Sequence, residues 1–109
     1  MCTYETYSVD VAGSGKGRQG WFGLSRATVY YDHPVHAFAE HTLNIDFAAP
    51  AQGPGARVAV ELTAESAVRL VTAVANALLG VPTSISGLDD DQLDKLRAIA
   101  SSAGELASR

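Results

Sequence analysis

The chain has 109 residues, of which 47% are hydrophobic and 18% are charged, and its net charge is −4. This length fits one domain and leaves no room for two independent cores. Acidic residues outnumber the scattered Lys and Arg, so the basic surface of a nucleic-acid-binding protein is missing. No apolar run approaches the ~18–20 residues of a membrane span, and the N-terminus lacks signal-peptide features. We therefore expect a cytoplasmic protein with neither nucleic acid nor membrane among its partners.

The first 62 residues carry the pattern of β-strands. Apolar and polar side chains alternate in TYETYSVDV and EHTLNIDF, ATVYY is rich in β-forming residues, and RVAVEL points its valines inward. We predict four antiparallel strands, near residues 3–12, 26–31, 40–48 and 56–62. Between them, GSGKGRQGWFG (residues 13–23) is expected to be a long loop or wide hairpin, and the segment around Pro34 a loop.

The sequence then changes to a helical period. Thr63 is a suitable N-cap, the predicted helix covers residues 64–79, and Gly80 ends it. Its apolar stripe is formed by Ala67, Leu70, Val71, Val74, Ala77 and Leu78. The predicted fold is therefore a two-layer α+β domain over residues 1–80, with a four-stranded antiparallel sheet and this amphipathic helix packed on it.

A second helix is expected after a linker at residues 81–87. Leucines and other apolar residues recur at helical spacing over 88–107, either against the same domain or against a partner chain. A lone helix covers one face of the sheet only. The other face is polar and aromatic, with Tyr4, Thr6, Ser8, Thr28, Tyr30, Thr42 and Asn44. Small sheets of this kind pair readily with a second copy, so we expect a homodimer.

All three histidines of the chain, His33, His36 and His41, fall within nine residues. Imidazole is the commonest metal ligand, and three imidazoles with one open position are typical of catalytic zinc sites. Among the neighbouring carboxylates, Asp32 and Glu40 are candidate general bases. The spacing His-x2-His-x4-His matches no standard zinc signature, and His41 is also compatible with a structural role in the core.

Cys2 is the single cysteine, so a disulfide within the chain is excluded. After removal of Met1, its amine and thiol would be neighbours, and the pair could act as a nucleophile or as a fourth metal ligand. The alternative is a half-buried cysteine that opens the first strand.

The glycine-rich segment could cradle an anion through its amides and Lys16, although the spacing is not that of a P-loop. A flexible hairpin loop is the alternative. Trp21 either fills the end of the core or lines a pocket that this segment closes. Tyr31, one of four tyrosines in the strands, joins Lys16 and Trp21 as a candidate substrate-binding residue.

Four blocks of the sequence, MCTY, GSGKGxxGWF, DHPVHA and EHTLNIDF, resemble a family of small proteins of unknown function from high-GC Gram-positive bacteria. The resemblance covers about residues 1–79. It implies no reaction. It does imply that Cys2, Lys16, Trp21, His33, His36 and His41 belong to the family's pattern and are candidate functional residues.

Two functional hypotheses follow. In the first, the histidines hold a divalent metal, zinc or else copper or iron, in a hydrolase, lyase or isomerase acting on small molecules. In the second, the chain is a non-enzymatic dimeric module that binds a small ligand or a partner on the polar-aromatic face of its sheet. The metal content of the purified protein distinguishes them.

Overall fold

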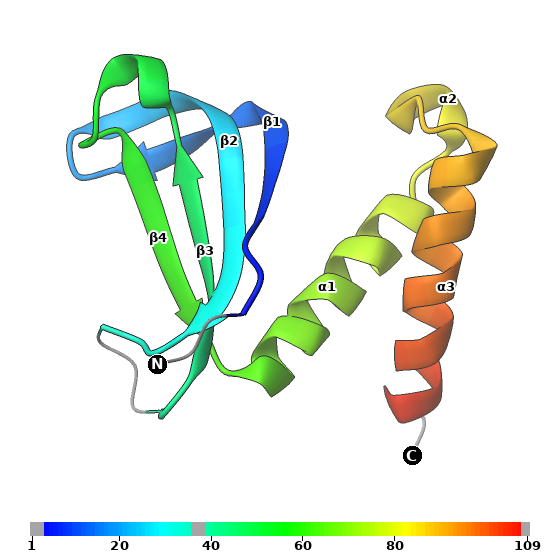
Figure 1. The fold of residues 1–109 in the computed structure, drawn as a ribbon. Helices are drawn as coiled ribbons and strands as arrows, with labels where there is room; N and C mark the ends of the chain where they lie inside the picture. Colours follow the sequence, from blue (N-terminus) through cyan, green and yellow to red (C-terminus); the bar gives the residue numbers. More distant parts are fainter. Residues whose placement is uncertain (1–3, 36–38, 108–109) are drawn as a thin grey trace. The chain divides into compact units, whose positions relative to one another are not determined.

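The computed structural model describes residues 4–35 and 39–107, with side chains as far as residue 101 (Figure 1). The chain divides into two compact units, Met1–Ala64 and Glu65–Arg109. The first unit contains all the described strands and the second contains the described α-helices, apart from the first residue of α1. The α+β class is therefore confirmed.

The first unit is a four-stranded antiparallel sheet in the order β1-β2-β3-β4. Its strands are β1 (Tyr7–Gly17), β2 (Gly20–Asp32), β3 (Thr42–Ala48) and β4 (Arg57–Leu62). A short 3-10 helix, η1 (Pro50–Gln52), lies in the connection between β3 and β4. The four predicted strands all exist, but β1 begins at Tyr7 rather than at residue 3 and extends to Gly17, and β2 begins at Gly20 rather than at residue 26.

Of the long loop or wide hairpin expected at residues 13–23, the loop is wrong: the segment forms a hairpin, and its turn is tight. These glycines pair across the β1–β2 hairpin down to Gly17 opposite Gly20, so only Arg18 and Gln19 remain in the turn. A Cβ atom added at Gly15 would lie 3.4 Å from Val58 Cγ2, which shows that the hairpin curls toward β4. Glycine permits this close approach because it has no side chain.

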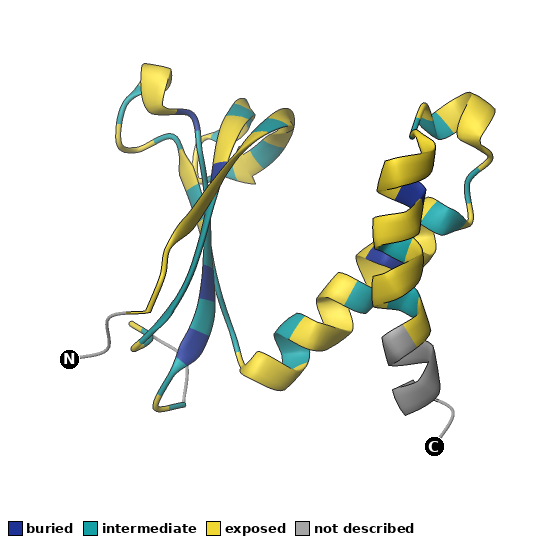
Figure 2. Ribbon diagram, turned by 45° about the vertical axis from the view of Figure 1, so that its right-hand side comes forward, coloured by how far each residue is buried: buried dark blue, intermediate teal, exposed yellow. Residues whose placement is uncertain are grey.

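The register separates the sheet into an apolar and a polar face. Neighbouring strands align Val9, Ala27, Phe47 and Val58 in one row, and Tyr7, Val29, Ile45 and Val60 in the next. On the other face the rows contain Ser8, Thr28, Asp46 and Ala59, and then Tyr30, Asn44 and Glu61. This places the predicted polar-aromatic residues of β1, β2 and β3 on one face. Figure 2 shows that the buried positions of this unit are few.

The second unit consists of α1 (Ala64–Leu79), α2 (Thr83–Ser86) and α3 (Asp90–Ala107). The bounds of α1 agree with the prediction, and α2 occupies part of the segment expected to be a linker. Helix α3 begins with a reciprocal cap, because the Gln92 N–H donates to the Asp89 side chain at 2.8 Å and the Asp89 N–H donates to Gln92 at 2.9 Å.

In this unit Ala75 of α1 and Leu93 of α3 are the buried apolar residues among those described. The predicted stripe of α1 is exposed over much of its surface, with Val71 and Val74 each at 49%. Packing of that stripe against the sheet stays a prediction. Across the part of the chain that the structure describes, no helix combines the length and apolarity needed to cross a membrane.

Candidate functional site

The two described histidines meet where β2 and β3 leave the sheet. The last residue pair of the ladder is Asp32 with Thr42, so the antiparallel register places residues 33 and 41 opposite each other next. The ring centres of His33 and His41 are 4.5 Å apart, with an angle of 31° between the ring planes. The hairpin register thus brings together two imidazoles that are eight positions apart in the sequence.

The backbone around His33 orients its ring. The Nδ1 atom of His33 lies 3.0 Å from the carbonyl oxygen of Glu40. Because a carbonyl can only accept a hydrogen bond, Nδ1 carries the proton, and the lone pair of the neutral ring is on Nε2. The His33 N–H donates to a carboxylate oxygen of Asp32 at 2.7 Å, which ties the start of this connection to the end of β2.

Aromatic rings support the imidazole pair on one side. Tyr31 stacks on His41 with ring centres 5.8 Å apart and an interplanar angle of 14°, and Tyr4 meets Tyr31 edge-on at 5.9 Å. His41 is half-buried, whereas His33 is exposed. The structure therefore groups Tyr31 with the histidines, at the opposite end of β2 from Lys16 and Trp21.

His36 and Cys2, the other two candidate metal ligands, lie outside the described residues. Within residues 4–35 and 39–107, no group of three or more His, Cys, Asp or Glu side chains is arranged to hold a metal ion. Asp32 and Glu40, the candidate bases, are each tied to His33 by the hydrogen bonds above, one through its side chain and the other through its backbone. The described part of the site is thus a two-imidazole arrangement.

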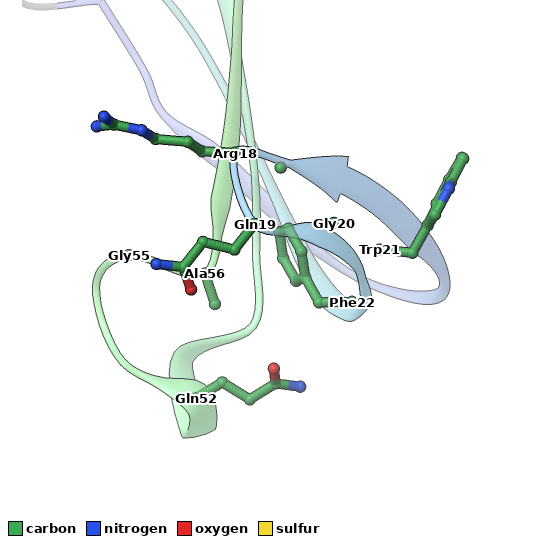
Figure 3. A pocket seen from close by; sticks show the side chains of 9 residues that line it. Arg18, Gln19, Gly20, Trp21, Phe22, Gln52, Gly55 and Ala56 are labelled. Carbon is green, nitrogen blue, oxygen red and sulfur yellow. The ribbon is translucent and has the colours of Figure 1, made fainter.

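Lys16 and Trp21 form a cross-strand pair near the tip of the β1–β2 hairpin. Trp21 is 71% exposed, so the expectation that it fills the core is wrong, since its strand position points it away from the half-buried Phe22. An open groove runs beside it, lined by Gly17, Arg18, Gln19, Gly20, Trp21, Phe22, Gln52, Gly55 and Ala56. Figure 3 shows the indole ring of Trp21 pointing away from Gln52 and from the other labelled side chains that line this groove.

A second groove lies on the polar face of the sheet, with a volume of about 540 Å³. It is lined by Tyr30, Val35, Asn44, Asp46, Arg57, Ala59, Val60 and Glu61. One lining residue, Asp46, accepts hydrogen bonds from Arg57 Nη2 at 2.7 Å and Nε at 3.1 Å and from the Tyr30 hydroxyl at 3.4 Å. The Val35 N–H donates to the carboxylate of Glu61, which ties the connection after β2 to this groove.

The charges in the second groove shift two titratable groups. Burial, together with the negative charge of Asp46, raises the pKa of Tyr30 above its ordinary value. The hydrogen bond to Asp46 raises the pKa of Arg57 further, so the guanidinium group stays charged across the physiological range. Sequence reasoning missed Arg57 and Glu61 as site residues. Their position opposite Ala48 and Asn44 in the β3–β4 register was the only signal that could have located them.

Comparison with known proteins confirms one part of the resemblance noted in the sequence, that to a family of unknown function. No curated protein and no solved structure matches the chain significantly. One family model, described as a family of unknown function (DUF6295), matches residues 1–86, which include the whole sheet, both grooves and helix α1. On this match, the chain belongs to the DUF6295 family.

Proposed function

We propose that the chain is a metal-dependent enzyme acting on small molecules, with zinc bound at a site that includes His33 and His41. The approach of the two imidazoles carries this proposal. Metal–nitrogen bonds of ~2.0–2.1 Å and coordination angles between square and tetrahedral place the ring centres of two ligands roughly 4.5–5.2 Å apart. The 4.5 Å between the ring centres of His33 and His41 lies at the lower end of this range, which corresponds to an angle near 90°, so a tetrahedral zinc requires the two rings to move slightly apart.

The hydrogen bond to His33 supports the same assignment. Histidines that bind metals commonly donate their second ring N–H to a carbonyl or carboxylate, which sets the tautomer and the ring orientation. His33 makes such a bond with the Glu40 carbonyl, which leaves the Nε2 lone pair available to a metal ion. The stack of Tyr31 on His41 restricts the second ring.

The remaining ligands are proposed to be His36 and Cys2, both outside the described residues. His36 lies three positions after His33 in the sequence. Cys2 lies two positions before Tyr4, and the Tyr4 ring contacts the Tyr31 ring. When bound, zinc would supply an activated water or polarise a carbonyl group of the substrate. Asp32 or Glu40 would then accept a proton as the general base, consistent with a hydrolase, lyase or isomerase.

The metal content of the protein, prepared without a histidine tag, tests this proposal. We expect about one zinc per chain by elemental mass spectrometry, and one-site binding when the chelator-treated protein is titrated with zinc chloride. Copper and iron salts are titrated in parallel, because imidazole ligands also suit these metals. Protein that is purified metal-free and shows no heat of binding with any of the three would contradict the proposal.

The groove around Asp46 favours a second candidate function, a module that binds a small polar ligand without catalysing a reaction. Its lining combines an Arg–Asp ion pair, a tyrosine hydroxyl and an amide with the apolar Val35 and Val60, which is typical of small-molecule sites. A thermal-shift screen of small carboxylic acids and amines against metal-free protein tests it. A ligand for this groove should lose its effect on Arg57→Ala and keep it on His33→Ala.

A further inference from the structure

We propose that two copies of the chain pair through the outer edges of their β4 strands and form one continuous antiparallel sheet, with a two-fold axis at Ala59. The inference is independent of the proposed metal site, because β4 contributes none of the proposed ligands. The partner it requires is a second copy of the chain, and the sequence of the strand itself selects that partner.

The outer edge of β4 presents backbone hydrogen-bonding groups. β4 is a terminal strand of the sheet and pairs with β3 along its other side. The Ala49 N–H donates to the Ala56 carbonyl at 3.0 Å, in the same register as the β3–β4 ladder. Since bonded pairs alternate along an antiparallel ladder, residues 58, 60 and 62 bond to β3. The N–H and C=O groups of residues 57, 59 and 61 therefore point to the outer edge.

This edge is self-complementary. If two β4 strands run antiparallel with Ala59 opposite Ala59 of the second copy, Arg57 lies opposite Glu61 of the second copy, and Val58 opposite Val60. The outward groups of Ala59 can then exchange two hydrogen bonds across the axis. Each Glu61 N–H can donate one further hydrogen bond to the Arg57 carbonyl of the other copy. The Arg57 N–H then keeps its bond to the Gly55 carbonyl at 3.0 Å.

Charge selects this register over its neighbours. With Ala59 on the axis, both Arg57 side chains face a Glu61 carboxylate, so two opposite-charge pairs form directly across the strands. Moving the axis to residue 58 or 60 keeps the same backbone groups facing outward but places Arg57 opposite Ala59 or Thr63. Neither alternative contains a pair of opposite charges. The sequence RVAVEL thus favours one arrangement of two identical strands.

Contacts within each chain hold the two charged groups on the same face. Arg57 is oriented by its bonds to Asp46, which use Nε and one terminal nitrogen of a guanidinium that has five N–H donors. Its side chain remains 53% exposed. Glu61 accepts the Val35 N–H and lies in the same cross-strand row as Asn44 and Tyr30. Arg57 and Glu61 thus share one face of β4, and each has a partner in its own chain and capacity for a further hydrogen bond.

Complementary charge reversal tests the proposal. Arg57→Glu alone and Glu61→Arg alone each place like charges opposite one another in both pairs, so we expect dimer dissociation constants at least about tenfold higher than for the wild type. When the two variants are mixed, every charge again faces its opposite. A one-to-one heterodimer should then form with close to wild-type affinity. Sedimentation velocity measures the association, and circular dichroism verifies that each variant is folded.

A backbone variant and a matched control complete the experiment. Ala59→Pro removes one outward N–H, which an edge strand tolerates, so we expect a folded monomer that mixing does not rescue. Arg69→Glu changes the charge of α1 by the same amount and should leave the dimer intact. A wild-type chain that remains monomeric up to about 1 mM, a concentration at which even a weak specific interface associates, overturns the proposal. Single variants that dimerise like the wild type, or a mixture that stays monomeric, also overturn it.

Discussion

The connections at the two ends of β2 differ in a way that their compositions do not reveal. The segment around its first residues, 13–23, contains five glycines. It is nevertheless almost entirely paired as a β-ladder, with a two-residue turn. The segment after it contains Pro34 and leaves the ladder at Asp32. Glycine can still donate and accept in a ladder, whereas proline has no N–H to donate. The two segments therefore differ in whether their backbone can form ladder hydrogen bonds, more than in flexibility. The glycine-rich segment extends the strands, and the segment with Pro34 leaves the sheet at the candidate site.

The largest expected effect is on the affinity for zinc, and it is confined to substitutions at the histidine end of β2. His41→Ala should lower the affinity for zinc by about a hundredfold or more, because it removes one of the proposed imidazole ligands. His33→Ala should have an effect of the same order. Isothermal titration with zinc chloride measures both changes.

Lys16→Ala is the control for these variants, because Lys16 is a polar candidate that pairs with Trp21 at the opposite end of β2. Its zinc affinity should equal that of the wild type. Equal losses in all three variants would show that general destabilisation, not ligation, accounts for the effect. Unchanged affinity in His41→Ala would contradict the proposed site.

A smaller effect is expected at the glycine-rich end, on stability. Gly20 has a φ of +115°, a conformation that residues with a side chain rarely adopt. Gly20→Ala should therefore lower the free energy of unfolding by about 1–3 kcal/mol. Urea unfolding followed by circular dichroism measures the change.

Gly13→Ala serves as the matched substitution. A Cβ atom there would meet no other atom within 4 Å, and Gly13 lies in the same strand pair. Its free energy of unfolding should change by less than about 0.5 kcal/mol. If both variants unfold at the same urea concentration, the turn at Gly20 does not limit the stability of this end.

The smallest effect concerns the polar face between the two ends. Burial and the charge of Asp46 raise the pKa of Tyr30 above 10.0, so the neutral phenol is favoured in the folded state. The stability that this contributes is fully present below pH 10 and is lost as the pH rises through the higher, folded-state value. Asp46→Asn should move the titration of Tyr30 toward lower pH, as measured by the ultraviolet absorbance of the phenolate.

Two variants identify and control that signal. Tyr30→Phe should remove the phenol that titrates late, which assigns the signal to this residue. Asp10→Asn removes a carboxylate from β1 in the row next to Thr28 and should leave the titration unchanged. A titration curve that is identical in Asp46→Asn and wild type would show that burial alone raises the pKa of Tyr30.

Local periodicity was sufficient for much of the fold. The alternation in EHTLNIDF and RVAVEL located β3 and β4 within two residues, and the helical period with Gly80 after it located α1 at Ala64–Leu79. These signals depend only on residues that are close in the sequence. The same alternation placed His41 on the face of Leu43; in the structure, Tyr31 of the neighbouring strand pairs with Leu43 and stacks on His41.

The sequence by itself determined the α+β class, the existence of all four strands and the bounds of α1, because each follows from the short-range pattern of apolar residues. Only the tertiary structure decided that the glycine-rich segment joins the ladder, that His33 faces His41, and that Asp46 bonds to Arg57 and Tyr30. These features depend on strand register. Register is set by the simultaneous pairing of whole strands, and a shift of one residue would move every side chain to the opposite face.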